Sequence, residues 1–399
     1  MKNKLTPAAK KAFVIGGVSV ATYVFNYVLR NMLSVLTPFM LREDAAAYTV
    51  EYIALLSSLY MALYATGQLF NGVLGDRFSP KTMVLLGLLA GGTVSAAFPF
   101  LPHGVLQMLC FAVLGYGLSM VRGPLMKIIS ENTAARHAQR ICMCFSSASF
   151  AGPLVAGVFA TVLQWRWAFV VAGGITAAVG VVSFAVLSVL EKRGQIAYKS
   201  IKGGGFKEIF SVFRIENFAF FLVVACLVEI TGMALSFWIP TLLNEYAGYT
   251  EKQASALYTL VSFCRALVPF TALGVLRLFG GKERRMMRVA YIVTLFLFVG
   301  MLVIPTGGVT VALLIGALMA NSLVAALLWS IYIPGLGATG RVSSINGILD
   351  CAGYLAASAA TSLFGAVVVH LGYRGLIVSF VVIPVLGIAT SFMKTKKSA

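Results

Sequence analysis

Twelve long apolar runs divide the 399-residue chain, and they constrain its fold more than any other feature. A helix needs about 20 apolar residues to cross the roughly 30 Å hydrocarbon core of a bilayer. Backbone polar groups must be satisfied internally in lipid, so runs of this length predict membrane-spanning α-helices and an all-α membrane protein. The predicted spans cover approximately residues 13–40, 52–75, 82–101, 105–130, 141–163, 167–190, 217–243, 253–278, 288–305, 309–333, 342–369 and 373–393.

The composition excludes a water-soluble fold of this size. Hydrophobic residues make up 59% of the chain and charged residues 11%, whereas soluble domains carry about 25% charged residues. The 6 cysteines lie in apolar runs and show no metal-ligand or disulfide spacing. The sequence contains no nucleotide-binding loop, metal cluster motif or nucleophile triad. We therefore expect neither an enzyme nor a cofactor.

Positive charge is distributed unevenly among the loops. The formal net charge is +18, which in a soluble protein would suggest a nucleic-acid partner. Here most lysines and arginines fall in the terminal segments and in the loops after even-numbered spans. The other loops carry Arg42, Arg166, Lys252 and Arg374. Because cytoplasmic loops are enriched in basic residues, we expect cytoplasmic termini, a multi-pass location in a plasma membrane (the inner membrane of a bacterium) and no nucleic acid.

The apolar runs fall into two related halves. Pro38 aligns with Pro240, and Gly72-Val73-Leu74 with Gly274-Val275-Leu276, at one ungapped offset. The longest loop lies between the halves and contains a run of three glycines and many basic residues, as flexible linkers do. Tandem halves of this kind place a solute site between them. The predicted domains are an N-terminal six-helix bundle, a cytoplasmic linker and a C-terminal six-helix bundle: 1–190, 191–216 and 217–399.

Arg30 is the residue that most strongly indicates a solute site. It lies inside the first span with Tyr27 and Asn31, and residues three or four positions apart share one face of a helix. Ionisable groups inside a bilayer are costly, so they face a cavity or a partner. A guanidinium can bind a carboxylate or phosphate through two parallel hydrogen bonds. An ion pair with Glu229 or Asp350 is the alternative interpretation.

Further polar side chains inside the spans extend this candidate site. Arg265 and Lys127 would supply positive charge for an anion, or form structural ion pairs. Tyrosines and amides on spans 2 and 11 would bind a hydroxylated solute, or link helices. The candidate contacts are Arg30, Arg265, Lys127, Tyr27, Asn31, Tyr64, Gln68, Asp350 and Tyr354. Glu229 and Asp350 would carry a coupled proton or neutralise an arginine.

The loop between spans 2 and 3 resembles a signature of the major facilitator superfamily. Its sequence is Gly72-Val-Leu-Gly-Asp76-Arg77-Phe-Ser-Pro-Lys81, similar to the superfamily pattern G-x-x-x-D-R/K. The resemblance implies two pseudo-symmetric six-helix bundles, the major facilitator fold, and transport by alternating access. It also implies a conformational latch made by Gly72, Asp76, Arg77 and Lys81. Asp76 can cap a neighbouring helix N-terminus in such a latch.

Within that superfamily the chain resembles the organophosphate:phosphate antiporters. The similar segments are Tyr27-Val-Leu-Arg30-Asn31, Trp238-Ile-Pro240-Thr, Lys127-Ile-Ile-Ser-Glu131 and Asn346-Gly347…Gly353-Tyr354. The resemblance implies that Arg30 binds a substrate phosphate. The chain departs from this family at Gly232 and Gln68, where members carry an arginine and often a lysine. Arg265 and Lys127 can supply that charge from other helices, and a carboxylate fits such a site equally well.

Taken together, the sequence predicts a secondary active transporter of a small organic anion. The solute would be a phosphate ester or a carboxylate, such as a sugar derivative. It would move by antiport or proton symport, with phosphate or a proton as the coupled species, and the protein is expected to be a monomer. One alternative is an exporter of amphipathic or cationic compounds, in which acidic residues bind the solute. Another is a non-transporting membrane sensor.

Overall fold

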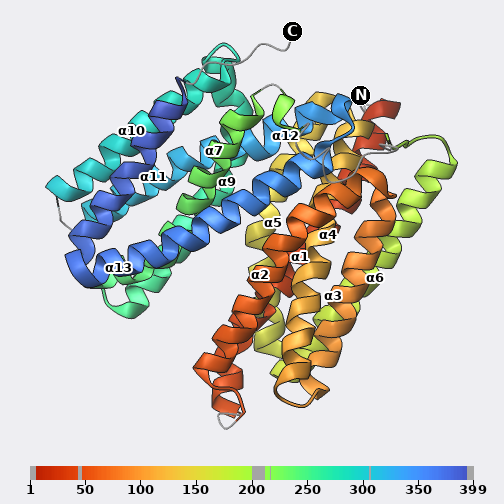
Figure 1. The fold of residues 1–399 in the computed structure, drawn as a ribbon, viewed down its shortest axis with the longest axis horizontal. Coiled ribbons are helices and arrows are strands. Elements are labelled where there is room, and N and C mark those ends of the chain that lie inside the picture. The colour runs from red at the N-terminus through yellow and green to blue at the C-terminus, as the bar shows by residue number, and fades with distance from the viewer. Residues whose placement is uncertain (1–5, 44–46, 200–211, 216, 305–306, 393–399) are drawn as a thin grey trace, which may run out of the picture. The chain divides into compact units, whose positions relative to one another are not determined.

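The protein is mainly helical in the part that the computed structural model describes, which is residues 6–43, 47–199, 212–215, 217–304 and 307–392. No strand occurs in these ranges, which confirms the predicted all-α class (Figure 1). The α-helices are α1 Pro7–Glu43, α2 Val50–Arg77, α3 Pro80–Ala97, α4 Val105–Asn132, α5 Ala135–Val162, α6 Trp165–Lys192, α7 Phe218–Glu229, α8 Ser236–Glu245, α9 Glu251–Leu278, α10 Glu283–Val303, α11 Gly307–Ala326, α12 Ile333–Gly335 and α13 Val342–Thr390. Short 3₁₀ and π segments adjoin them: η1 Phe98–Phe100, η3 Ile230–Leu235, η4 Leu327–Tyr332 and η5 Leu336–Thr339.

The helices account for each of the predicted spans. Within the described residues, 10 helical stretches are long and apolar enough to cross a membrane. One of them, α13, consists of two helices that meet at Gly372, where φ is 65°. The 28-residue helix α5 falls outside that set and contributes the shorter apolar segment Ala151–Val162. Counting both halves of α13 and adding α5 gives the twelve predicted spans.

Local sequence signals set several helix ends. Thr49 accepts a hydrogen bond from the backbone N–H of Tyr52 at the start of α2. Thr250 and Gln253 form a reciprocal capping box at the start of α9, which satisfies backbone donors that a helix leaves unpaired. Pro80 begins α3, where its missing N–H and fixed φ cost nothing. These caps define the turns that separate neighbouring spans.

The chain forms two compact units, which we call unit 1 and unit 2. Unit 1 comprises Met1–Ile209 together with Ile333–Ile348, and unit 2 comprises Phe210–Tyr332 together with Leu349–Ala399. The segment Ile333–Ile348 thus belongs with the N-terminal helices, although the predicted C-terminal bundle 217–399 includes it. The six-plus-six division remains a prediction. Most of the predicted linker, residues 200–211 and 216, lies outside the described residues.

In unit 1, three helix pairs make the main packing: α2 with α4, α3 with α6, and α1 with α5. Small residues allow close approach, as membrane helix pairs require. A Cβ at Gly92 on α3 would lie 2.5 Å from the carbonyl oxygen of Gly173 on α6. Larger residues at this crossing would separate the two helices.

In unit 2, α10 and α9 both pack against α11, and α8 packs against α9. The second half of α13 packs against α10, since a Cβ at Gly387 would lie 2.6 Å from the ring of Tyr291. The fully buried rings of Phe298 and Phe380 contact each other, with centroids 5.7 Å apart. These contacts form the apolar core of the unit.

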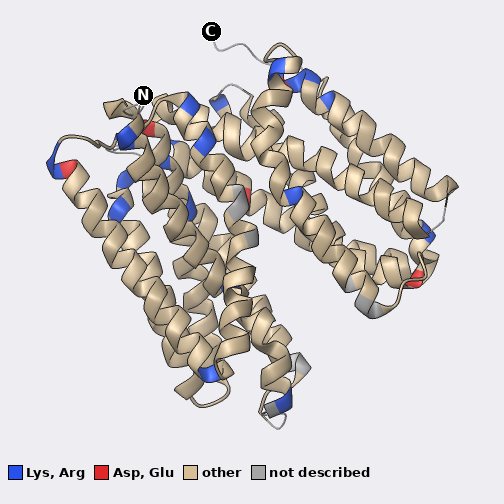
Figure 2. Ribbon diagram, turned by 180° about the vertical axis from the view of Figure 1, so that it is seen from behind, with Lys and Arg blue, Asp and Glu red and all other residues tan. Residues whose placement is uncertain are grey.

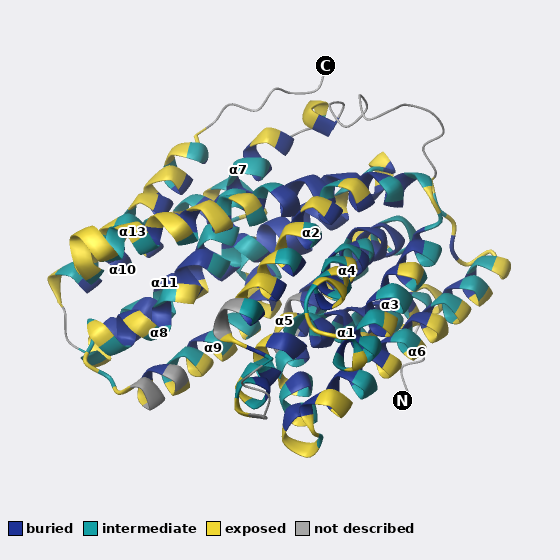
Figure 3. Cartoon of the chain, turned by 60° about the horizontal axis from the view of Figure 1, so that its bottom comes forward, coloured by how far each residue is buried: buried dark blue, intermediate teal, exposed yellow. Residues whose placement is uncertain are grey.

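The outward surface of the helices is apolar. Phe13, Phe296 and Val369 are 76%, 71% and 80% exposed. Figure 3 shows exposed residues along the outer faces of helices such as α6 and α10, opposite their buried faces. Exposed apolar surface of this extent indicates contact with lipid, as expected for a multi-pass membrane protein.

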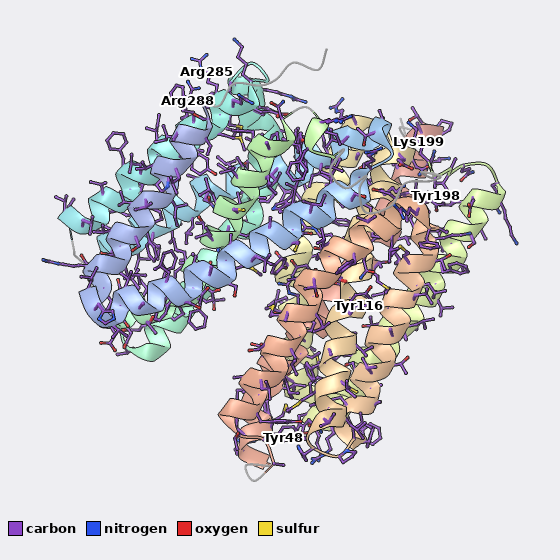
Figure 4. The ribbon with its side chains drawn as sticks, in the orientation of Figure 1. Tyr48, Tyr116, Tyr198, Lys199, Arg285 and Arg288 are labelled. Carbon is purple, nitrogen blue, oxygen red and sulfur yellow. The ribbon has the colours of Figure 1, made fainter. Side chains whose placement is uncertain are left out.

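Basic residues gather at one end of unit 1. Figure 2 shows most of its lysines and arginines at the end that carries the N-terminus, and few at the opposite end. Figure 4 marks the two ends: Tyr198 and Lys199 lie at the N-terminal end and Tyr48 at the other. This distribution parallels the loop charges in the sequence.

Candidate functional site

Arg30 of unit 1 lies among aromatic rings. Its guanidinium carbon is 5.3 Å from the ring centroid of Tyr27 on its own helix and 5.0 Å from that of Tyr64 on α2. Tyr64 is 1% exposed and stacks on Tyr60 at 5.8 Å. A guanidinium that stacks on aromatic faces keeps its five N–H donors in its own plane. The structure therefore brings together Arg30, Tyr27 and Tyr64 as one cluster, which we call the Arg30 cluster.

Polar groups without partners extend along α2 from this cluster. The Tyr60 hydroxyl and the Gln68 side-chain nitrogen are buried, and neither has a hydrogen-bond partner among the described residues. Buried polar groups are normally paired, so these two are available to a polar solute or to water. Asn31, by contrast, donates to the carbonyl oxygen of Tyr27 at 2.7 Å. That bond ties the Asn31 amide to its own helix.

Asp76, at the end of α2, caps the N-terminus of α13 within unit 1. Its carboxylate accepts hydrogen bonds from the backbone N–H groups of Ser343 at 3.2 Å and Ser344 at 2.8 Å. These donors belong to the first turn of α13, where the helix dipole favours negative charge. The side chain is 2% exposed, which strengthens its electrostatic interactions.

Lys127 of α4 completes this buried group. Its ammonium, 1% exposed, donates to the Asp76 carboxylate at 3.2 Å, the Asp76 carbonyl oxygen at 3.1 Å and the Gly340 carbonyl oxygen at 3.2 Å. Glu131, one turn along α4, lies 3.9 Å from the same ammonium. Lys127 is thus placed against Asp76 rather than in the Arg30 cluster. We call Asp76, Lys127, Ser343 and Ser344 the latch group.

Glycines allow the first turns of α13 to approach α2 closely. A Cβ at Gly72 would lie 2.9 Å from the Cα of Gly347 and 2.9 Å from the carbonyl oxygen of Ser343. A Cβ at Gly347 would overlap the carbonyl oxygen of Gln68. Real Cβ atoms do not come this near, so Gly72 and Gly347 are both required by packing in this arrangement.

The chain that follows α6 binds beside the latch group. The backbone N–H of Ala197 donates to Asn132 at 2.8 Å, and that of Lys199 to Glu131 at 3.0 Å. The Lys199 ammonium donates to the carbonyl oxygen of Ala338 at 3.2 Å (Figure 4). Burial raises the pKa of Tyr198 above its usual value, and nearby carboxylates raise it further, so its hydroxyl stays protonated. Glu131 therefore links this segment to Lys127.

The two other predicted latch residues lie at the same end of the helices. Lys81 of α3 forms an ion pair with Glu191 and donates to Ser188 at 3.0 Å, both on α6. These contacts join α3 to α6. Arg77 is half-buried at the end of α2, one residue beyond Asp76.

In unit 2, Arg265 of α9 lies against the irregular part of span 7. Its Nη1 atom donates to the hydroxyl of Ser236 at 2.7 Å. A Cβ at Gly232 would lie 3.7 Å from Arg265 Nη2 and 4.0 Å from a carboxylate oxygen of Glu229. Arg265 and Glu229 are thus brought together over Gly232.

Helix α13 packs against the same carboxylate. A Cβ at Gly353 would lie 2.5 Å from the Cγ of Glu229. Asp350 is fully buried on α13, and Tyr354 is half-buried one turn further on. The structure therefore places the predicted candidates in three groups: the Arg30 cluster and the latch group in unit 1, and the residues around Arg265 and Glu229 in unit 2.

Sequence reasoning missed several residues of these groups. Ser343 and Ser344 act through backbone N–H groups, which carry no side-chain signal. Ser236 is an ordinary serine in an apolar run, and its role depends on the distant Arg265. Tyr60, by contrast, is one of the span 2 tyrosines that the helical spacing of the polar face predicts beside Tyr64.

These features define a class of protein: a multi-pass helical membrane protein with charged residues held inside its bundles. A family model described as "Major Facilitator Superfamily" matches residues 20–358. The chain therefore belongs to the Major Facilitator Superfamily and is a membrane transporter.

A relative in Mycobacterium tuberculosis, described as "Uncharacterized MFS-type transporter Rv1250", is 28% identical over 148 residues. The match covers 35% of this chain and 25% of the relative. The chain thus aligns with a quarter of that protein's length, and the similarity carries no information about the solute.

Proposed function

We propose that this transporter moves a small organic anion, a phosphate ester or a carboxylate, by secondary active transport. Arg30 in unit 1 and Arg265 in unit 2 are its cationic contacts. The observation that carries the proposal is the position of Arg30, half-buried in a span between the rings of Tyr27 and Tyr64. A charge held inside a membrane bundle is costly and marks a solute or ion site by default.

The surroundings of Arg30 support a hydroxylated anion. Tyr60 and Gln68 each have a buried polar atom without a partner among the described residues, and both lie on α2, as does Tyr64. A solute with hydroxyl groups would form hydrogen bonds with these two atoms. Its binding would remove the free-energy cost of leaving buried polar atoms without a hydrogen bond. The resemblance to organophosphate:phosphate antiporters points to the same solute class and to exchange for phosphate, and proton symport is the other mode of coupling.

We also propose that the latch group closes the cytoplasmic end of the transporter. The basic residues at that end of unit 1 support the orientation, since cytoplasmic segments are enriched in lysine and arginine. The buried Asp76–Lys127 pair supports a closed state, because its charges are out of water only while the first turn of α13 covers them. Opening this end would expose both charges to solvent.

Uptake into liposomes tests the proposed solute class. The purified protein is reconstituted, and uptake of labelled glycerol 3-phosphate, inorganic phosphate, glucuronate and a cationic dye is compared. We expect uptake of at least one organic anion, with Arg30→Ala and Arg30→Lys both raising KM about tenfold or more, because lysine cannot provide the planar two-donor contact. Arg42→Ala, at the end of the same helix, is the control and should leave KM unchanged.

Three outcomes would refute the proposal. Anion uptake that survives Arg30→Ala with an unchanged KM would remove Arg30 from the site. Transport of the dye alone would favour the exporter, with Glu229 and Asp350 as solute contacts. No transport of any compound by a correctly folded protein would favour a membrane sensor.

A further inference from the structure

Basic residues gather at one end of unit 2, where α9 ends and α10 begins. Glu283 is the only acidic residue between positions 277 and 288, so this segment carries a net positive charge. Figure 4 marks Arg285 and Arg288 at this end of the unit. The basic residues, which we call the α10 cluster, are Arg277, Lys282, Arg284, Arg285 and Arg288.

The corresponding loop of unit 1, between α2 and α3, balances its charges with ion pairs. Lys81 pairs with Glu191, and Asp76 pairs with Lys127. At the offset that aligns the two halves, Leu278 takes the position of Asp76. The loop of unit 2 therefore has no counterpart of the Asp76 carboxylate, and a latch does not account for the α10 cluster.

Two arginines of the α10 cluster are held in place by other helices. Arg288 donates from Nε to the hydroxyl of Ser391 at 3.0 Å and from Nη2 to its carbonyl oxygen at 3.3 Å. Its guanidinium carbon lies 3.9 Å from the ring centroid of Phe392, which is 63% exposed. Arg284 donates to the side chain of Asn217 at 2.7 Å. The preference for basic residues in cytoplasmic loops requires positive charge but not fixed side chains. A guanidinium that is already fixed loses less entropy when it binds an oxyanion.

Arg285 lies at the head of an exposed stripe along α10. Its side chain is exposed, and it has no hydrogen-bond or ion-pair partner among the described residues. Val289, Val293 and Phe296 follow it at helical spacing and are 37%, 43% and 71% exposed. Arg285 thus lies where a lipid-facing apolar surface meets water, and Arg288 lies one turn along the same helix.

We propose that Arg285 and Arg288 bind the phosphate of an anionic phospholipid, such as phosphatidylglycerol, whose acyl chain lies along the exposed stripe of α10. Guanidinium groups bind phosphate oxygens through parallel hydrogen bonds, and basic clusters beside a membrane-spanning helix bind anionic lipids. A lipid fits this surface better than a soluble phosphate does, because a lipid contacts both the arginines and the apolar stripe. The inference does not depend on which solute is transported.

Native mass spectrometry of the full chain in detergent tests this site. Binding of dioleoylphosphatidylglycerol is compared with that of dioleoylphosphatidylcholine, whose headgroup has no net charge. We expect the native protein to bind the anionic lipid more tightly, and Arg285→Gln and Arg288→Gln each to weaken its binding about fivefold. The matched control is Arg277→Gln, at an exposed residue in the last turn of α9, and it should bind the anionic lipid as the native protein does.

Arg285→Gln is the decisive variant. Because this side chain is exposed and has no partner among the described residues, its replacement should leave the melting temperature of the lipid-free protein unchanged. Equal affinity of the native protein for the two lipids would overturn the proposal. So would an equal loss of binding in Arg277→Gln and Arg285→Gln, because it would show a diffuse attraction to this end of the unit. Displacement of the lipid by excess glycerol 3-phosphate would also overturn it, because it would indicate a site for a soluble anion.

Discussion

The Asp76–Lys127 pair allows a prediction with a definite sign. Both side chains are 2% exposed or less, and they are joined at 3.2 Å. Replacing one partner of a buried ion pair leaves an uncompensated charge and costs about 3–5 kcal/mol. Replacing both by uncharged residues of similar shape is often nearly neutral. We expect Asp76→Asn and Lys127→Met each to destabilise the protein, and the double variant to be more stable than either single variant.

The remaining contacts set the size of each effect. In Asp76→Asn the new side chain can still accept a hydrogen bond from the Ser344 N–H. The Lys127 ammonium loses its nearest negative charge, and its remaining partners are two backbone carbonyl oxygens and the Glu131 carboxylate at 3.9 Å. In Lys127→Met the Asp76 carboxylate keeps two backbone donors at the N-terminus of α13, which favour its charge. Lys127→Met should therefore be the milder single change. Since each single change is expected to cost about 3–5 kcal/mol and the double change little, the coupling free energy of the double-mutant cycle should exceed about 3 kcal/mol.

Thermal and denaturant unfolding of the four detergent-solubilised proteins measures this coupling. The matched control is the cycle Lys81→Met with Glu191→Gln. The side chains of that pair are 16% and 39% exposed, so its coupling should stay below about 1 kcal/mol. Additive effects of Asp76→Asn and Lys127→Met, with the double variant the least stable of the four, would refute the argument that each buried charge compensates the other.

Three further predictions follow from other contacts. Gly347→Ala should lower the melting temperature, because the added methyl group overlaps the Gln68 carbonyl oxygen. The same change should increase alkylation of cysteines introduced near Gln68. Unchanged alkylation would contradict the close packing of α13 against α2. Glu131→Gln should speed trypsin cleavage after Lys199, since the neutral amide accepts the Lys199 N–H more weakly than a carboxylate does; an unchanged cleavage rate would contradict this contact. Arg30→Lys should raise KM for the transported anion with little change in melting temperature. A clear fall in melting temperature together with the raised KM would indicate that Arg30 has a structural role.

The spans could be predicted because each depends on its own sequence. Hydropathy places helices wherever an apolar run is long enough, and the structure confirms the all-α class with a helix at each predicted run. The predicted gap between the last two spans, 370–372, coincides with the break at Gly372. A glycine there tolerates the positive φ that separates the two helices.

The partners of the charged residues could not be predicted, because they depend on contacts distant in sequence. Glu131 follows Lys127 by four residues, so helical spacing alone predicts the two as neighbours, and they do lie 3.9 Å apart. Nothing in the sequence indicates that Lys127 also reaches Asp76 and Gly340. The position of Arg265 over Gly232 likewise depends on how α9 packs against span 7.

The π segment η3 has a consequence for comparison with relatives. A π turn contains one residue more than the α turn it replaces, so it corresponds to a single-residue insertion within a span. Removing one residue from Ile230–Leu235 would restore a regular α-helix and rotate α8 by about 100° relative to α7. Glu229 and Ser236 would then no longer face Arg265 together. Relatives that lack this extra residue should therefore have a regular α-helical span 7 and a different arrangement of charges at this position. In an alignment with the present chain, a one-residue gap within span 7 would identify them.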